Sequence, residues 1–366
     1  MKSRMQLSSR IMKHRWYTSR SSLWLMVGVL LFTGCDLFDS SDSAPTSDVA
    51  LFPVLLNDRW GYINAEGVMV LQPVYQQAGR FSEGRAPVRF SFRNHFIDGT
   101  GEIAIDGRGV FQDVRPFQDG RAAVRLQNRW GFVDRDGQFV INPVYRGAGD
   151  FSEDRVFVRS VDFGSYFYLT GEGSVLPYPE GINGFQPIAD NQFNDGLALI
   201  RTSDRYGFIN TDGSLAIEPV YAEALPFSQE LAAVKVADRW GYINRDGVVL
   251  ISPQFISAGR FADERAPVRR DSNQFGYVDT SGRIIISEQF DQARVFSQER
   301  AAVQLDGKWG FIDLQGNPVT EIRFDEVEDF YKGLARFTVL VPTDDGQVPS
   351  FGYINRDGRI VWPASR

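Results

Sequence analysis

A phrase that returns about every 35 residues constrains the fold of this chain more than any other feature. The phrase F-S-E-G-R-A-P-V begins at Phe81, and related phrases begin at Phe117, Phe151, Phe193, Phe227, Phe261, Phe296 and Phe330. Successive starts are 36, 34, 42, 34, 34, 35 and 34 residues apart. A chain of 366 residues with a fixed internal period is expected to form one repeat architecture rather than two or three unrelated domains.

A second element, an aromatic residue followed by glycine, keeps the same period. It occurs at Trp60-Gly61, Trp130-Gly131, Tyr206-Gly207, Trp240-Gly241, Phe275-Gly276, Trp309-Gly310 and Phe351-Gly352. Two weaker copies, NHFIDGTG from Asn94 and YFYLTGEG from Tyr166, fill the gaps, with His95 and Phe167 in the position of the glycine. The two elements together predict nine units between residues 50 and 366.

Each unit is predicted to contain three or four short strands and no helix. In RAAVRL (121–126) apolar and polar residues alternate, which is typical of a strand. The RWGFVD segment gives a second strand, and Asp134 with Gly137 three positions later marks a type I turn. The third strand carries a proline that cannot donate to a ladder and so marks an edge or a strand end, at Pro73, Pro143, Pro219 and Pro253.

The pairing of a large ring with a glycine predicts close packing between units. In RWGYIN, Trp240 and Tyr242 face one side of a strand while Gly241 and Ile243 face the other. Both sides are apolar, which indicates a strand buried on both faces, and a glycine lets a backbone or ring approach closely. We therefore assign the seven ring-glycine pairs a repeat-packing role. We predict that each ring packs against the glycine-containing strand of a neighbouring unit.

Two all-β arrangements of nine units remain open. An open, twisted, solenoid-like array is favoured, because no unit is split between the two ends of the chain and nine blades exceed the usual four to eight. The alternative is a closed ring like a β-propeller, which agrees with strands that are apolar on both faces.

The N-terminal residues predict export and attachment to a membrane. Residues 23–33, LWLMVGVLLFT, are too short to span a bilayer and follow several basic residues, as in a signal peptide. LFTGC resembles a bacterial lipobox, which implies a signal peptide over 1–34 and a lipidated Cys35. Residues 35–49, rich in Ser and Asp, then form a flexible tether ahead of the repeat domain at 50–366. The alternative is a free cysteine beside a general cleavage site.

Charge and residue usage exclude several functions. The net charge is −7, and removal of the six basic residues in 1–34 leaves −13, which disfavours binding to nucleic acid. One cysteine and two histidines cannot supply a disulfide or a Cys/His zinc site within one chain. His95 is the one histidine after the leader, and Glu264 and Glu299 recur in predicted solvated turns. We predict no enzyme, catalytic residue, metal or cofactor.

The ring-glycine element and the F-S-E-G phrase resemble the WG-repeat (KWG-repeat) family of bacterial proteins over about residues 50–366. The resemblance implies an all-β tandem array that acts as an interaction or sensor module, and it brings no catalytic residues. We expect a protein partner in the cell envelope, contacted through the inserts at 176–187 or 341–350. The alternatives are glycan binding by exposed Trp60, Trp130, Trp240 and Trp309, and a structural envelope protein without a specific ligand.

Overall fold

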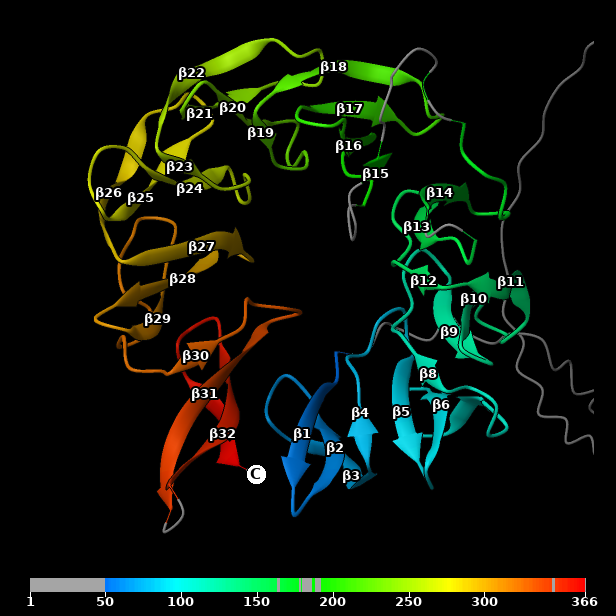
Figure 1. The fold of residues 1–366 in the computed structure, drawn as a ribbon. Helices are drawn as coiled ribbons and strands as arrows, with labels where there is room; N and C mark the ends of the chain where they lie inside the picture. The colour runs from blue at the N-terminus through cyan, green and yellow to red at the C-terminus, as the bar shows by residue number, and fades with distance from the viewer. Residues whose placement is uncertain are drawn as a thin grey trace, which may run out of the picture. The chain divides into compact units, whose positions relative to one another are not determined.

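The computed structural model describes residues 50–162, 165–177, 179, 186–187, 192–343 and 346–365. The predicted signal peptide, Cys35 and the tether lie outside these residues. Within them the regular secondary structure is all β, and nine small antiparallel sheets stand in a ring (Figure 1). The fold is a nine-bladed β-propeller, and the prediction of nine all-β units is confirmed. The described residues include no helix of the length and apolarity needed to span a membrane.

The strands of the nine blades follow one another in chain order. Blades 1 to 3 contain β1 (Phe52–Leu56), β2 (Arg59–Ile63), β3 (Met69–Tyr75); β4 (Gln77–Ala78), β5 (Ala86–Phe90), β6 (Arg93–Ile97), β7 (Ile103–Ile105); β8 (Asp113–Val114), β9 (Ala122–Leu126), β10 (Arg129–Val133), β11 (Phe139–Tyr145). Blades 4 to 6 contain β12 (Gly147–Ala148), β13 (Arg155–Arg159), β14 (Tyr166–Thr170); β15 (Gln186–Pro187), β16 (Leu197–Arg201), β17 (Tyr206–Asn210), β18 (Leu215–Tyr221); β19 (Glu223–Ala224), β20 (Ala232–Val236), β21 (Arg239–Ile243), β22 (Val249–Phe255). Blades 7 to 9 contain β23 (Ser257–Ala258), β24 (Arg265–Arg269), β25 (Phe275–Asp279), β26 (Ile284–Phe290); β27 (Gln292–Ser297), β28 (Arg300–Leu305), β29 (Lys308–Ile312); β30 (Glu326–Val327), β31 (Leu334–Thr343), β32 (Gly346–Asn355), β33 (Ile360–Ser365).

Tight turns fold each unit into its sheet. In a full blade the short first strand lies toward the centre of the ring and the last strand at its periphery (Figure 1). The F-S-E-G phrase forms a two-residue hairpin in which Glu83 and Gly84 have φ of 52° and 77°, as a type I′ turn requires. In the predicted N/D-x-x-G turn, the Asn244 side chain accepts hydrogen bonds from the backbone N–H groups of Asp246 and Val248.

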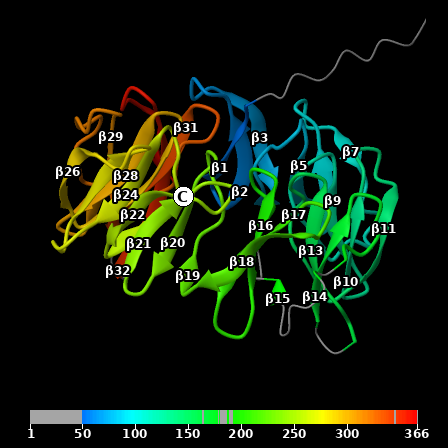
Figure 2. The ribbon, with the colours of Figure 1, turned by 90° about the horizontal axis from the view of Figure 1, so that it is seen from above.

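The hydrophobic core lies between neighbouring blades. The ring two residues after the tryptophan position packs edge-on against the phenylalanine that opens the F-S-E-G phrase of the next blade. In eight such pairs the ring centroids are 4.8–5.0 Å apart and the interplanar angles are 62–78°. Tyr242 and Phe261, one of these pairs, are both fully buried. Figure 2 shows the successive blades side by side around the ring.

A second contact joins the blades near the periphery. The glycine of most N/D-x-x-G turns lies against the last strand of the preceding blade, so that a Cβ on Gly282 would sit 2.9 Å from Ile251 Cγ2. The same contact joins Ile286 to Gly316. These glycines have positive φ, and the turn therefore presents a flat backbone surface to the neighbouring side chain.

The ring closes where blade 9 meets blade 1. Tyr353 packs against Phe52 with centroids 5.6 Å apart, and its hydroxyl donates a 2.9 Å hydrogen bond to the Pro53 carbonyl. Val361 of β33 lies against Gly67, which repeats the peripheral contact of the other blades. Every sheet is built from consecutive strands, so no strand is exchanged across the seam. Of the two arrangements left open, the chain adopts the closed ring rather than the favoured open array, because packed faces close it without a split blade.

The seam predicts a matched pair of stability effects. Tyr353→Phe leaves the buried Pro53 carbonyl without its donor, and we expect the free energy of unfolding to fall by about 1–2 kcal/mol. Tyr242→Phe removes the corresponding hydrogen bond to the Gly259 carbonyl inside the ring and should cost a similar amount. Urea unfolding of both variants measures the two losses. A loss for Tyr242→Phe without one for Tyr353→Phe would mean that the seam is open in solution.

Candidate functional site

The glycine that follows each aromatic residue makes room for a bulge in its own sheet. Trp240 pairs with Phe255 and Tyr242 pairs with Ile251. Gly241, the one residue between the two rings on β21, therefore faces three residues of β22. A Cβ on Gly241 would lie 2.5 Å from the Ile251 carbonyl oxygen and 2.8 Å from the Pro253 nitrogen. No side chain larger than hydrogen fits between the two strands without displacing one of them.

The other six glycines of these pairs have similar surroundings. Their nearest neighbours are backbone or side-chain atoms of their own blade, for Gly61, Gly131, Gly207, Gly276, Gly310 and Gly352. The glycines therefore face their own sheet and not the ring of a neighbouring unit, because the bulge occupies that space. The predicted packing of a ring on the glycine-containing strand of a neighbouring unit is seen at the seam, where Trp60 stacks on Phe351 of β32 with centroids 5.5 Å apart. The prolines of the third predicted strand lie inside this bulge, on the outermost strand, rather than at its end.

A cation lies over six of the seven aromatic residues of the pairs, and the seventh, Trp60, stacks on Phe351 of blade 9 with centroids 5.5 Å apart. Trp130 and Trp240 are 8% and 9% exposed, and Trp60, Tyr206, Phe275, Trp309 and Phe351 are half-buried. Arg115 lies 4.8 Å from the Trp130 ring centroid, and Lys235 lies 5.9 Å from that of Trp240. Trp130, Trp240 and Trp309 thus lie between a cation and the interblade core, and the four tryptophans do not form an exposed ladder.

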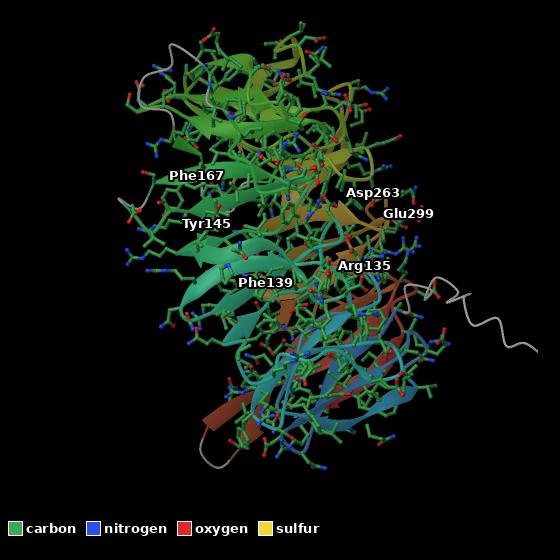
Figure 3. The ribbon with its side chains drawn as sticks, turned by 90° about the vertical axis from the view of Figure 1, so that its right-hand side faces the viewer. Arg135, Phe139, Tyr145, Phe167, Asp263 and Glu299 are labelled. Carbon is green, nitrogen blue, oxygen red and sulfur yellow. The ribbon has the colours of Figure 1, made fainter. Side chains whose placement is uncertain are left out.

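The repeat is broken in the two blades that lack this glycine. In blade 2 the last strand, β7, stops at Ile105, so the register shift opposite the glycine position of the other blades is missing, and the His95 side chain is buried there, 4% exposed. In blade 4 the last strand is reduced to one bridge between Leu169 and Val175. Phe167 there packs edge-on against Tyr145 of blade 3, with centroids 5.9 Å apart (Figure 3). A residue larger than glycine is accommodated where the bulge is missing.

A cleft of about 390 Å³ opens between blades 2 and 3 where β7 stops. The chain turns away into the loop 106–111, which the Asn94 side chain holds by a 3.1 Å hydrogen bond to the Phe111 carbonyl. We call this cavity the blade 2–3 cleft. It is lined by loop 106–111 with Ala104 and Ile105 on one side, and by Asp136, Gly137, Gln138 and Phe139 on the other.

The blade 2–3 cleft combines carboxylates with apolar surface. Asp106 accepts a 2.8 Å hydrogen bond from the Arg108 backbone N–H and lies 3.1 Å from His95 Nδ1. The backbone hydrogen bond and the nearby His95 lower the pKa of Asp106, so it is charged at neutral pH. Phe139 and Val110 at the cleft are 40% and 49% exposed.

Exposed phenylalanines gather in the same two blades. Among the described residues the exposed ones are Phe90, Phe92 and Phe139, all in blades 2 and 3. Phe92 lies at a hairpin tip with φ 63°, a backbone conformation that a large side chain rarely adopts. Sequence reasoning marked His95 as a departure from the repeat but missed loop 106–111 and the cleft. The missing P-V-Y triplet in this unit is the signal that could have found them.

The remaining candidate residues lie apart from the cleft. Glu264 and Glu299 occupy F-S-E-G turns, where their backbone N–H groups donate to Gln229 and Asp263 of the preceding blades. The insert at 341–350 extends β31 and β32 into a long hairpin, whereas most of the insert at 176–187 lies outside the described residues. No group of three or more His, Cys, Asp or Glu in the described ranges is placed to hold a metal ion.

Comparison with known proteins identifies the family. Seven segments match the WG containing repeat, at 60–90, 96–130, 130–160, 206–240, 240–273, 275–309 and 309–339. These segments cover more than half of the chain, which therefore belongs to the WG-repeat family, as the sequence resemblance indicated. No curated protein matches the chain.

Solved structures resemble the fold at low sequence identity. A structure described as the eukaryotic initiation factor aligns with a TM-score of 0.57 and 10% identity, and the match covers 85% of this chain and 95% of that one. BamB from Moraxella catarrhalis aligns with a TM-score of 0.39 and 13% identity, covering 82% of this chain and 95% of that one. At these identities the first match shows a common fold alone.

The bulge predicts which glycines tolerate a methyl group. We expect Gly241→Ala to lower the free energy of unfolding by about 1–3 kcal/mol, because the new Cβ overlaps the backbone of β22. Gly149→Ala is the matched control, since its Cβ would meet the Phe157 carbonyl oxygen at an ordinary 3.4 Å, and we expect a change within about 0.5 kcal/mol. Denaturant unfolding compares the two. Equal effects would contradict the role given to the bulge.

Proposed function

We propose that this protein is an exported, membrane-tethered lipoprotein whose propeller is a scaffold for a protein partner in the cell envelope. The observation that carries the proposal is the blade 2–3 cleft, an irregular and partly apolar site in a ring whose blades are joined by repeated contacts. The signal-peptide pattern and the LFTGC segment before Cys35 support the tether.

The regular ring favours a binding role for the irregular blades. Eight nearly identical ring pairs and the Tyr353–Phe52 pair at the seam join the nine blades, so the cleft lies within a continuously packed ring. His95, the histidine on which a catalytic relay would depend, is buried beside Asp106 rather than presented to a substrate. These features support a scaffold and not an enzyme.

Burial of the tryptophans counts against the glycan alternative. Stacking on sugars needs exposed ring faces, whereas Trp130 and Trp240 are almost fully buried and Arg294 covers the Trp309 ring at 4.6 Å. A purely structural envelope protein would leave the exposed side chains of the cleft, such as Val110, without a partner. A scaffold protein and a structural envelope protein therefore differ in one testable outcome. A crosslinker placed at the cleft would capture a defined partner only for the scaffold.

The tether is tested by changing the predicted lipid acceptor. In cells fed a labelled fatty acid, we expect the wild-type chain to carry the label and to fractionate with membranes. Cys35→Ser should lose the label and appear in the soluble exported fraction, because one thiol is the only predicted attachment point. A second serine change, at Thr46 in the tether, should leave both properties unaltered. An unlabelled wild-type protein would refute lipidation.

The partner is tested by photocrosslinking in intact envelopes. We expect a benzophenone side chain at Val110, 49% exposed at the cleft, to capture a defined protein. The same group at Val249, 47% exposed on the last strand of blade 6, is the matched control and should not capture it. Mass spectrometry identifies the products. No product from position 110, or the same products from both positions, would argue against a partner at the cleft.

A further inference from the structure

We propose that the blade 2–3 cleft binds the cationic side chain of a lysine or arginine on the partner protein. This inference rests on the proposed scaffold function and adds the chemistry that the cleft recognises. The volume of about 390 Å³ lies at the lower end of the range for ligand pockets and suits one long side chain with its adjoining backbone.

The apolar lining fits the methylene stem of such a side chain. Phe111 of loop 106–111 and Phe139 of β11 meet edge to face, with centroids 6.4 Å apart and an interplanar angle of 88°. The two rings come from neighbouring blades and line the cleft, where Phe139 is 40% exposed. A ring face attracts a cation, and the methylene groups of lysine or arginine pack on apolar surface.

Two carboxylates meet the charged end from opposite walls. Asp106, on the blade 2 wall, accepts a hydrogen bond from the Arg108 backbone N–H and lies 3.1 Å from His95 Nδ1. Asp136 lies on the blade 3 wall, in a turn whose shape is set by a 3.0 Å hydrogen bond from its own N–H to the Asp134 carboxylate. The turn therefore places Asp136, whose side chain is exposed, at the wall of the cleft. Both carboxylates can accept charge-assisted hydrogen bonds from an ammonium or guanidinium group.

Arg108 also lines the cleft, and its charge distinguishes a cationic ligand from an anionic or zwitterionic one. A cationic ligand is repelled by Arg108, whereas an anionic or zwitterionic ligand would need it as a partner. The two carboxylates outnumber the single guanidinium, and the chain without its leader has a net charge of −13. The local and the overall charge both attract a cation.

The experiment uses two fluorescent nonapeptides that differ only in a central arginine or its uncharged analogue citrulline. We expect the full chain to bind the arginine peptide at least fivefold more tightly in a fluorescence anisotropy titration at low salt. Asp136→Asn should weaken binding of that peptide two- to fivefold, a range typical of an exposed ion pair. Asp246→Asn, in the equivalent turn of blade 6, is the matched control and should have no effect.

The sign of the Arg108→Ala effect decides the class of ligand. Removal of this like charge should tighten binding of the arginine peptide two- to fivefold. Equal affinity for the two peptides, or weaker binding of the arginine peptide to Arg108→Ala, would overturn the proposal. If a partner is still captured at position 110 in that case, the scaffold function stands and only the cation site is wrong. If the peptides discriminate but no partner is captured, the cation site stands and the envelope partner is wrong.

Discussion

The structure depends on one contact, the edge-to-face packing of two rings across each blade boundary. Each pair buries one ring from a strand of one blade and one ring from the phenylalanine next to the F-S-E-G hairpin of the following blade. Tyr242 of blade 6 and Phe261 of blade 7 are an example. Aromatic pairs of this geometry contribute about 0.5–1.5 kcal/mol beyond the burial of their surface. The hydroxyls of Tyr62, Tyr242 and Tyr277 also donate to backbone carbonyls of the next blade. Burial raises the pKa of Tyr242 far above its usual range, so its hydrogen bond is present at every physiological pH.

The seam shows how the same contact is adapted where a partner is lacking. At three other boundaries the serine after the phenylalanine, Ser152, Ser228 or Ser297, donates its hydroxyl to the phenylalanine carbonyl of the next blade. Described blade 1 has three strands and begins at Ala50. In blade 9 the serine is replaced by Tyr331, whose longer side chain reaches past blade 1 to the Phe81 carbonyl of blade 2. Arg80 of blade 2 lies over the Tyr331 ring and pairs with Glu328. Larger side chains thus span the distance that a hairpin covers at the other boundaries.

The sequence predicted the units of this fold better than their assembly. The period, the alternation of 121–126 and the turn signals defined nine all-β units, because these properties are local. The bulge opposite Gly241 could not be read, since it depends on the register between two strands and not on either strand alone. Ring closure depends on contacts between Tyr353 and Pro53, 300 residues apart, and on a small rotation repeated at each boundary. No property of a single unit shows whether that rotation adds up to a full circle.

The candidate site is found where blade 2 lacks the glycine that lies opposite a bulge in seven other blades. The glycine and the bulge opposite it occur together in those blades. Blade 2 lacks the glycine, and it also lacks the strand segment that forms the bulge. His95 is buried at the glycine position, and the chain beyond Ile105 is free to leave the sheet. The side chain that replaced the glycine then lies beside Asp106, at the base of the new loop. The same substitution that breaks the repeat therefore also positions a carboxylate in the cleft. Blades 2, 3 and 4 keep their ring pairs, so the blades on both sides of the cleft are packed in place before a ligand binds. Binding then requires little loss of conformational entropy from these blades.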